Sequence, residues 1–407
     1  MALFYILSAL ALISLGLNLW QWLAARRFPL HQPVPAADGL PPVTLLKPLK
    51  GCDEHTEACL RSWLAQEYPA PIQALFGVKD ADDPVCEVVR RLIKEFPQHD
   101  IRLVICPAAP ALNPKVSTLI QLEPLIGRAT SVDQDNSERA VESALPERAV
   151  VISDADVQVP PGYLAGAMTI LQREGVGLVN SFYRLANPVN RAMWIEAVAV
   201  NCDFWSQVCQ SNSLRPMKFA LGAAMGLRAE TLRQVGGFAA LADYLADDNR
   251  LGLLVHRAGL RVELTNAVVD CFSGPMTLRQ VWDHQLRWAR TIRVCEPVPF
   301  FFSVLTNALV WSVLWVLVAI PFGIGWQLMT ATGGLVAYAA VRLATAWNNG
   351  AKLTQGRLSL WKIAQVLDLR DGLGFLWWLF AFLGNRIVWR GRRYRILKEG
   401  RLQPLDR

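Results

Sequence analysis

Residues 149–157 read AVVISDADV, and this stretch indicates the kind of fold on which the chain is built. Residues 149–152 are apolar, as in a strand that is buried on both faces. The run then ends in Asp154 and Asp156, two carboxylates one residue apart. Carboxylates rarely lie beside a buried strand unless they are paired or bind something. The stretch therefore predicts a core strand with a polar site at its carboxyl end.

Strands of the same kind precede it in the sequence. They read VTLLKPL (43–49), IQALFGV (72–78) and IRLVICP (101–107), and helix-like segments lie between them. This alternation predicts an α/β domain at residues 42–297, with a mainly parallel sheet covered by helices on both faces. Ligands of such sheets bind at the carboxyl ends of the strands. The candidate site is therefore expected where these strands end.

Asp154 and Asp156 are the candidate metal ligands. Two carboxylates spaced D-x-D can both reach one divalent cation, and their oxygens suit Mg²⁺ or Mn²⁺. Such a site usually completes its coordination with substrate phosphates. The alternative is a cap or a turn, which is common for acidic residues at this spacing.

A second acidic loop follows the strand at 72–78 and reads KDADDP. Asp83 precedes Pro84, an arrangement typical of the start of a helix. Capping accounts for only one of the three carboxylates. Asp80 and Asp82 are therefore left over, and they could hydrogen-bond a ribose or a base. Capping alone is the alternative interpretation.

A third acidic pair lies in LADDNRLG at residues 245–252. Asp247 and Asp248 begin a predicted helix, where the helix dipole favours acidic side chains. The functional alternative is that one of them is a general base that deprotonates an acceptor hydroxyl. The sequence leaves both interpretations open.

The stretch HQLRWARTIR at residues 284–293 is a predicted basic helix. Arg287 and Arg290 are three residues apart and therefore share a face. Arginine and the indole N–H of Trp288 suit a diphosphate leaving group or a sugar hydroxyl. The alternative is contact with lipid phosphates, which explains the arginines better than the tryptophan.

Residues 127–148 are polar and charged and are predicted to be a surface insertion. Asp133 and Asp135 within it also have the D-x-D spacing, but no strand precedes them. They are interpreted as solvated surface residues.

The chain also has long apolar segments. Residues 3–23 are long enough to span a bilayer, and Arg26 and Arg27 follow them. No basic residue precedes this segment, so a retained anchor at residues 1–25 is favoured over a cleaved signal. The positive-inside rule then places the domain that follows in the cytoplasm.

A second apolar block covers residues 300–347, and Pro321, Gly323 and Gly325 interrupt it. Two transmembrane helices joined by a tight turn are therefore expected. Residues 359–407 are expected to form interfacial or re-entrant helices and a basic C-terminal tail. The basic cluster WRGRRYR would then lie at lipid headgroups on the cytoplasmic side.

Composition supports a membrane protein with an anionic partner. Apolar residues make up 53% of the 407 residues, and the formal net charge is +7. Nucleic acid is the least favoured partner, because no nucleic-acid-binding motif is present. The eight cysteines are scattered and form no C-x-x-C pair, which is typical of buried thiols in a reducing compartment.

The order of these motifs resembles that of the ceramide glucosyltransferases and the related bacterial hopanoid-associated glycosyltransferases. These are membrane-bound, family-2-like enzymes with a GT-A fold. The matching stretches are LLKPLKG (45–51), GVKDADDP (77–84), NPKVSTL (113–119), SDADV (153–157), GGF (236–238), LADD (245–248), LRWAR (286–290) and WRGRRYR (389–395). The resemblance therefore covers nearly the whole chain.

The resemblance implies a GT-A, Rossmann-like domain between N-terminal and C-terminal transmembrane or interfacial helices. It also implies an inverting hexose transfer from a UDP-sugar to a lipid hydroxyl, with UDP-glucose and ceramide as the first expectation. The implied roles are nucleotide binding by Asp80, Asp82, Asp83, Lys115 and Asp154, metal binding by Asp154 and Asp156, and catalysis by Asp248, Arg287 and Trp288.

The chain departs from the family pattern in two places. His284 lies four residues before the tryptophan, where polysaccharide synthases have Gln and animal ceramide enzymes have Arg. The insertion at 127–148 is the other departure, and no role is assigned to it.

Three alternatives to glucose transfer remain. They are N-acetylglucosamine transfer to a hopanoid polyol, a polysaccharide synthase, and a non-catalytic membrane scaffold. The expected location is a bacterial inner membrane, because no organelle retention signal is present.

Overall fold

The computed structural model describes residues 1–128 and 148–405. These residues form two compact units. The sheet unit comprises Leu30–Ala186 and Pro216–Gly274, and the helical unit comprises Met1–Pro29, Asn187–Arg215 and Pro275–Arg407. The larger part of the expected insertion, residues 129–147 with Asp133 and Asp135, lies outside the described residues.

An eight-stranded sheet forms the centre of the sheet unit, in the order β3-β2-β1-β4-β7-β6-β8-β5. The strands are β1 (Val43–Leu49), β2 (Ile72–Val78), β3 (Asp100–Ile105), β4 (Ala149–Ser153), β5 (Val157–Gln158), β6 (Val176–Leu185), β7 (Ala224–Arg228) and β8 (Arg261–Cys271). The first four strands pair in parallel, and Val43 on β1 is in register with Ile72 on β2 and Ala149 on β4. β7 runs antiparallel between β4 and β6. β6 and β8 are parallel, and the short β5 runs antiparallel to β8. The predicted mainly parallel α/β sheet is confirmed, and the antiparallel strands β7 and β5 are additions to it.

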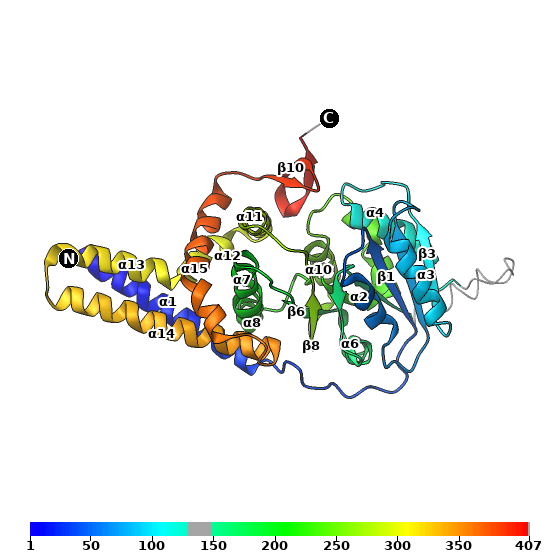
Figure 1. Ribbon diagram of the computed structural model, residues 1–407, viewed down its shortest axis with the longest axis horizontal. Helices are drawn as coiled ribbons and strands as arrows, with labels where there is room; N and C mark the ends of the chain where they lie inside the picture. Colours follow the sequence, from blue (N-terminus) through cyan, green and yellow to red (C-terminus); the bar gives the residue numbers. More distant parts are fainter. Residues whose placement is uncertain (129–147, 406–407) are drawn as a thin grey trace. The chain divides into compact units, whose positions relative to one another are not determined.

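Helices and short helical turns surround this sheet (Figure 1). They are α2 (Thr56–Leu64), α3 (Val85–Glu95), α4 (Pro114–Leu122), η1 (Glu123–Leu125), α6 (Tyr163–Leu171), α9 (Ala229–Gln234), η4 (Phe238–Leu241) and α10 (Asp247–Arg257). α3 has the apolar spacing of a helix with one buried face: Val85, Val88, Val89 and Leu92 are buried.

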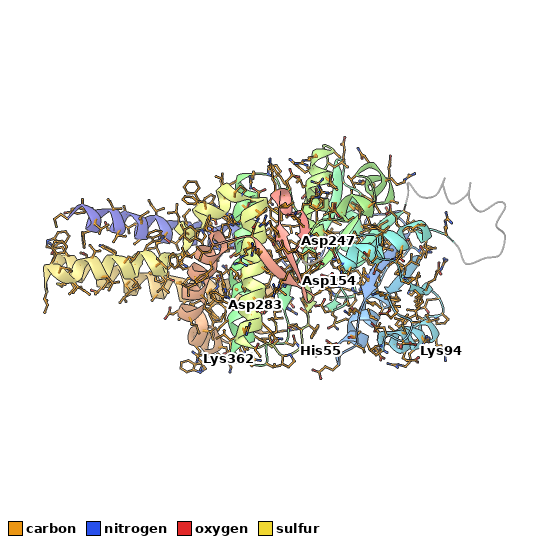
Figure 2. The ribbon with its side chains drawn as sticks, turned by 90° about the horizontal axis from the view of Figure 1, so that it is seen from above. His55, Lys94, Asp154, Asp247, Asp283 and Lys362 are labelled. Atoms are coloured by element: carbon orange, nitrogen blue, oxygen red, sulfur yellow. The ribbon has the colours of Figure 1, made fainter. Side chains whose placement is uncertain are left out.

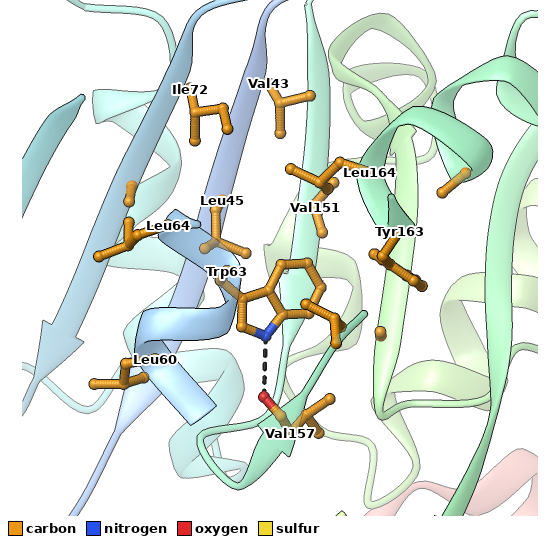
Figure 3. Packing of buried hydrophobic residues seen from close by; sticks show 14 of the residues in the cluster. Val43, Leu45, Leu60, Trp63, Leu64, Ile72, Val151, Val157, Tyr163 and Leu164 are labelled. Carbon is orange, nitrogen blue, oxygen red and sulfur yellow. Dashed lines mark hydrogen bonds between the residues drawn. The ribbon is translucent and has the colours of Figure 1, made fainter. Parts of the chain in front are cut away.

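Trp63 of α2 is fully buried in the core of the sheet unit (Figure 3). Its ring packs edge-on against Tyr163, with 5.3 Å between ring centroids. Its indole N–H donates a 3.0 Å hydrogen bond to the carbonyl of Val157. Because Val157 directly follows the Asp154–Asp156 segment, this bond fixes the turn that carries both carboxylates. Removing such an aromatic side chain costs about 3–5 kcal/mol of stability.

The helical unit contains most of the long helices. They are α1 (Ala2–Arg27), α7 (Arg191–Val198), the π-helix η3 (Ala199–Phe204), α8 (Trp205–Leu214), α11 (Leu278–Cys295), α12 (Pro297–Phe302), η5 (Ser303–Thr306), α13 (Ala308–Ala319), η6 (Ile320–Phe322), α14 (Trp326–Thr354) and α15 (Leu360–Phe382).

Two helices of this unit, α1 and α14, are long and apolar enough to cross a membrane. A third span results if the pair α12–η5 and α13–η6, bent by 54°, counts as one. Large apolar side chains on α1 and α14 are exposed, among them Leu12 (63%) and Met329 (70%). Apolar surface of this extent suits contact with lipid. The part of the chain that the structure describes is therefore built to associate with a membrane.

α1, α13 and α14 lie side by side (Figure 1). Phe4, Trp315 and Ala331 belong to one buried cluster that joins the three helices. Gly334 permits the close approach of α14 to α13, since a Cβ atom there would lie 2.4 Å from the Trp315 ring. The chain turns between α13 and α14 at residues 320–325, and Gly323 there has φ of 72°.

The C-terminal residues differ from the expected helix and tail. α15 ends at Phe382, and the chain continues as a three-stranded antiparallel sheet of β9 (Arg386–Trp389), β10 (Arg392–Ile396) and β11 (Leu402–Pro404). A short turn, η7 (Lys398–Gly400), precedes β11. Arg390 and Gly391 both have positive φ, as a two-residue hairpin turn requires. The basic cluster therefore forms a β-hairpin.

Candidate active site

Asp154 lies directly after β4, at the carboxyl end expected from the sequence. Its backbone N–H donates to the carbonyl of Ala223, which precedes β7. Its carboxylate forms an ion pair with Lys115, with 2.7 Å between Nζ of the lysine and Oδ1 of Asp154. The same ammonium lies 3.3 Å from Oδ2 of Asp247. Figure 2 shows Asp154 and Asp247 close together. Lys115 thus joins two acidic segments far apart in the sequence.

Lys115 is held at the start of α4 by Asn113. Asn113 is the N-cap of this helix, and its Oδ1 accepts from the backbone N–H of Lys115 at 3.0 Å. Its Nδ2 donates to Oδ1 of Asp247 at 3.3 Å. Asn113 is therefore a supporting residue that sequence reasoning did not single out. The Asn-Pro signal for a helix start was present in the sequence and could have identified it.

Asp247 and Asp248 begin α10, and their carboxylates have different partners. Asp247 bonds Asn113 and Lys115, and Asp248 accepts a 2.7 Å hydrogen bond from the backbone N–H of Asn249 in the first turn of the helix. Burial, together with the like charge of the neighbouring Asp247, raises the pKa of Asp248 to about 7 against the opposing effect of Lys115. A carboxylate that titrates near neutral pH can accept a proton from a hydroxyl. The helix-start interpretation and the base interpretation therefore both remain, since Asp248 contacts a first-turn N–H and its raised pKa suits a base.

Gly222 provides the space that Asp248 occupies. A Cβ atom at this position would lie 2.7 Å from Oδ2 of Asp248 and 3.1 Å from its carboxyl carbon. Only a glycine leaves the carboxylate in this place.

The second acidic residue of the D-x-D motif, Asp156, has a pKa raised to about 6. Surrounding protein atoms remove part of its hydration, and the like charge of Asp154 adds to the effect. Its backbone carbonyl accepts from the N–H of Phe272, which holds the turn against the end of β8. A bound divalent cation would favour the ionised form of this carboxylate.

Lys47 is a buried cation behind the two carboxylates. It is fully buried on β1, with Nζ 3.3 Å from the hydroxyl of Ser153 and 5.0 Å from the centre of the Trp63 ring. Burial lowers its pKa to about 8, while Asp156 and Asp154 raise it. Sequence reasoning missed Lys47, although a lysine within the apolar run VTLLKPL was a visible signal.

Carboxylate oxygens such as those of Asp154 and Asp156 are the kind of ligand that Mg²⁺ and Mn²⁺ prefer. The Lys115 ammonium at 2.7 Å demonstrates that the Asp154 carboxylate faces a cation in this structure. Within residues 1–128 and 148–405, no group of three or more His, Cys, Asp or Glu side chains could hold a metal ion by itself. Further oxygens, such as those of a diphosphate, would have to complete the coordination.

The acidic loop after β2 divides into one structural residue and two exposed ones. The two carboxylate oxygens of Asp83 each lie 3.0 Å from the N–H of Gly51, and Oδ1 also accepts from Val85. Asp83 therefore braces the start of α3. Asp80 and Asp82 are exposed, and both are free of side-chain ion pairs to the described residues.

Arg287 and Trp288 belong to the helical unit, on α11. This helix starts with a capping box between Thr277 and Gln280. The His284 ring lies 4.7 Å from the Trp288 ring, and its Nδ1 hydrogen-bonds the carboxylate of Glu196 on α7. Burial lowers the pKa of Arg287, and Glu196 opposes this effect. Glu196 is buried and was missed from sequence, because nothing local to α7 marks it as a partner of His284.

The chain matches a known protein family and several curated proteins. The sequence model of glycosyl transferase family 21 matches residues 5–126 and 141–402. Ceramide glucosyltransferase 3 of Caenorhabditis elegans is 22% identical over 269 residues, which are 66% of this chain and 54% of that protein. Ceramide glucosyltransferase of Candida albicans is 36% identical over 63 residues, 15% of this chain and 12% of that protein. The chain spans about half the length of the longer-matching curated relatives.

Solved structures also resemble the chain. The mannosyltransferase PcManGT from Pyrobaculum calidifontis, in complex with GDP-Man and Mn²⁺, has a TM-score of 0.48 and 20% identity. The match covers 92% of this chain and 99% of that one.

Proposed function

Because the chain belongs to glycosyl transferase family 21, we propose that it transfers a hexose from a UDP-sugar to a hydroxyl of a membrane lipid. The family and the mainly parallel, GT-A-type sheet expected from the sequence are confirmed. The observation that carries the proposal is the group of Lys115, Asp154 and Asp247 beside Asp248 at the carboxyl end of the sheet. UDP-glucose and ceramide are the first candidates for donor and acceptor.

Asp248 is proposed as the catalytic base. Its carboxylate would take the proton of the acceptor hydroxyl while the hydroxyl oxygen forms a bond to the anomeric carbon of the sugar. The bond from that carbon to UDP breaks, UDP leaves as the anion, and attack from the opposite face inverts the configuration. A pKa of about 7 leaves a substantial fraction of Asp248 ionised at neutral pH.

Asp154 and Asp156 are proposed to hold Mg²⁺ or Mn²⁺ on the diphosphate. When bound, such an ion stabilises the negative charge of the leaving group. Lys115 supplies a further positive charge at this place, and Asp80 and Asp82 are proposed to bind the ribose or base. The role of Asp83 is structural, because its carboxylate accepts hydrogen bonds from Gly51 and Val85 at the start of α3. Arg287 and Trp288 are proposed to contact the leaving group or the acceptor.

The location follows from the apolar helices. We expect an integral membrane protein with several spans, whose sheet unit faces the cytoplasm of a bacterial cell. The basic residues Arg26 and Arg27 at the end of α1 support that orientation.

Transfer assays with purified full-length chain in detergent test the proposal. UDP-glucose and UDP-N-acetylglucosamine are each offered with ceramide or with a hopanoid polyol, with and without Mn²⁺, and lipid products are read by mass. Metal-dependent glucosylceramide is the expected product. A hopanoid product would keep the mechanism and change the substrates. If no pair gives transfer or UDP release, the proposed reaction is wrong for these substrates.

A further inference from the structure

The C-terminal hairpin of β9 and β10 is strongly basic, and its charge is not balanced within its own segment. Residues 384–397 include five arginines and no acidic residue. Residues 286–295, the second half of α11, include three more arginines and again no acidic residue. Glu296 follows them, but its carboxylate pairs with Arg215 at 2.9 Å. The two stretches therefore carry a large excess of positive charge.

Hydrogen bonds from α11 join the two stretches within the helical unit. Nη1 of Arg290 donates to the backbone carbonyl of Arg386, and Nη2 of Arg293 donates to that of Gly384 at 3.4 Å. β9 is an edge strand of its sheet, so it has no neighbouring strand on one side. α11 and β10 are also in contact (Figure 1). The arginines of the helix and those of the hairpin thus form one basic surface.

Like charges face one another on this surface. Arg386 on β9 is directly opposite Arg395 on β10. The Cβ atoms of such a cross-strand pair lie about 4.5–5.5 Å apart, and like charges in this position repel. Burial lowers the pKa of Arg290, and the positive charge of Arg293 lowers it further. An anion between these guanidinium groups would replace repulsion by attraction.

Three buried nitrogen atoms at this surface lack a hydrogen-bond acceptor. They are the Nε atoms of Arg290, Arg293 and Arg395, and none of them bonds another residue that the structure describes. Leaving a buried donor without a partner is costly. The arrangement therefore indicates an acceptor from outside the chain. Phosphate oxygens match the planar fork of donors that a guanidinium group presents.

Apolar side chains and a candidate membrane span adjoin the arginines. Ile292, Leu383 and Val388 are exposed, and Val388 is on the same face of the hairpin as the opposed arginines. The bent pair of helices that counts as a third candidate span begins at Pro297, four residues after Arg293 (297 − 293). Basic residues beside a span commonly contact anionic lipid headgroups. The surroundings therefore suit a phosphate that belongs to a lipid.

We propose that α11 and the C-terminal hairpin together bind the phosphate of an anionic phospholipid. Its phosphodiester oxygens would accept hydrogen bonds from the Nε–H groups of Arg290, Arg293 and Arg395. The apolar part of the lipid next to the headgroup would contact Val388 and Ile292. This lipid is neither the donor nor the acceptor of the transfer reaction, and the claim does not depend on that reaction.

The experiment uses the full chain in phosphatidylcholine nanodiscs with two photoreactive probes, a diazirine-bearing phosphatidylglycerol and a diazirine-bearing phosphatidylcholine. Labelled peptides are identified by mass spectrometry. We expect the phosphatidylglycerol probe to label peptides from residues 286–302 or 382–397 at least about tenfold more, because only this probe has a net negative charge. Equal labelling by the two probes would overturn the proposal. Inorganic phosphate that removes the labelling at the concentration of the probe would assign the site to a soluble anion instead.

Two variants each remove one member of the opposed pair. Arg395→Gln and Arg386→Gln should each lower the phosphatidylglycerol labelling by about tenfold, because a charged partner of the phosphate is lost. Arg279→Gln is the matched control, since Arg279 is an exposed arginine on the same helix, eleven residues before Arg290 (290 − 279). Its labelling should equal that of the wild type. Equal labelling of the wild type and both hairpin variants would contradict the site.

Thermal unfolding separates lipid binding from a purely structural role of these arginines. Phosphatidylglycerol should raise the unfolding midpoint of the wild type and of Arg279→Gln more than that of Arg395→Gln, because a ligand stabilises the state that binds it. In phosphatidylcholine alone, Arg395→Gln should unfold at the wild-type temperature or above it, because the repulsion from Arg386 is removed. A lower midpoint there, with an unchanged response to phosphatidylglycerol, would make Arg395 structural and overturn the proposal.

Discussion

The Lys115 ammonium lies 2.7 Å from the carboxylate of Asp154, although 39 positions separate the two residues (154 − 115). Asn113 fixes the backbone of Lys115, and Asp247 lies on the other side of the ammonium. The carboxylate that is expected to hold a metal is thus already paired with a cation of the protein. A bound nucleotide diphosphate would therefore lie beside both a cation of the protein, Lys115, and an expected metal ligand, Asp154.

Replacement of Lys115 tests this arrangement. Lys115→Met leaves Asp154 and Asp247 without their shared cation, so we expect weaker binding of UDP, by about tenfold or more, since a charge-assisted hydrogen bond is lost. Stability should also fall, by about 2–3 kcal/mol, less than for a fully buried pair because Asp154 is 43% exposed. Calorimetric titration and chemical unfolding measure the two effects. In the double variant with Asp247→Asn the loss of stability should be smaller than the sum of the single losses. Strict additivity would contradict the pairing.

The pH dependence of transfer tests the role of Asp248. A base is active when ionised, so kcat should rise with pH and reach half its maximum near pH 7, where Asp248 titrates. Below that pH the rate should fall about tenfold per unit. Asp248→Asn should abolish this dependence together with the activity. A flat profile in the wild type between pH 6 and 8 would argue against Asp248.

The same pKa predicts an effect on stability. The pKa of Asp248 is raised on folding, so the folded chain keeps a proton that the unfolded chain has released between about pH 4 and pH 7. Stability is therefore lost as the pH rises from about 4 to 7, and the full cost of ionising Asp248 remains above pH 7. Asp248→Asn removes this cost, and it should raise the unfolding midpoint at pH 8 more than at pH 5. Urea unfolding at both pH values checks the difference, and an equal shift at both would contradict the raised pKa.

Gly222→Ala should move the Asp248 carboxylate. The added methyl group would lie 2.7 Å from Oδ2, so either the side chain or the backbone must shift. A displacement of this size is expected to lower kcat about a hundredfold with little change in UDP binding. Gly162→Ala is the control, because nothing lies within 4 Å of its Cβ position. An unchanged kcat in Gly222→Ala would contradict a role of Asp248 in the transfer reaction.

The aspartates of the loop at Asp80–Asp83 are expected to have two different roles, one in stability and one in nucleotide binding. Asp83→Ala loses hydrogen bonds to Gly51 and Val85, so we expect a loss of about 1 kcal/mol in stability. Asp80→Ala and Asp82→Ala should leave stability unchanged and weaken UDP binding. Unfolding curves and nucleotide titration of the three variants decide the matter. Weakened stability in all three, with equal UDP binding, would make the loop purely structural.

The sequence predicted the parts of the fold whose signals are local. The apolar runs that end at Val78 and Ile152 correctly predicted β2 and β4, and Asp154 was expected at a strand end. The antiparallel position of β7 depends on pairing with β4 and β6, which no local pattern reveals. The C-terminal hairpin was missed because its strands are short and follow an apolar helix, so the period-two pattern of RIVW was taken for helix.

For the site, spacing identified the carboxylates but could not supply their partners. The pair Asp247–Asp248 was ambiguous in sequence, because a helix start and a base look alike there. The structure adds the partners of Asp247, which are Lys115 and Asn113 from another segment of the chain. Lys47 was missed although its place in an apolar run is unusual, and Glu196 was missed because no local pattern marks it. Their significance arises from burial beside a distant partner.

One measurement tests the central claim most directly. The purified full-length chain and its Asp248→Asn variant are given the same UDP-sugar and lipid acceptor with Mn²⁺, and the glycolipid product is quantified by mass. UDP binding to both proteins is measured alongside as a check on folding. We predict that Asp248→Asn binds UDP as the wild type does and loses transfer by about a thousandfold or more. Transfer at the wild-type rate by Asp248→Asn would contradict the account.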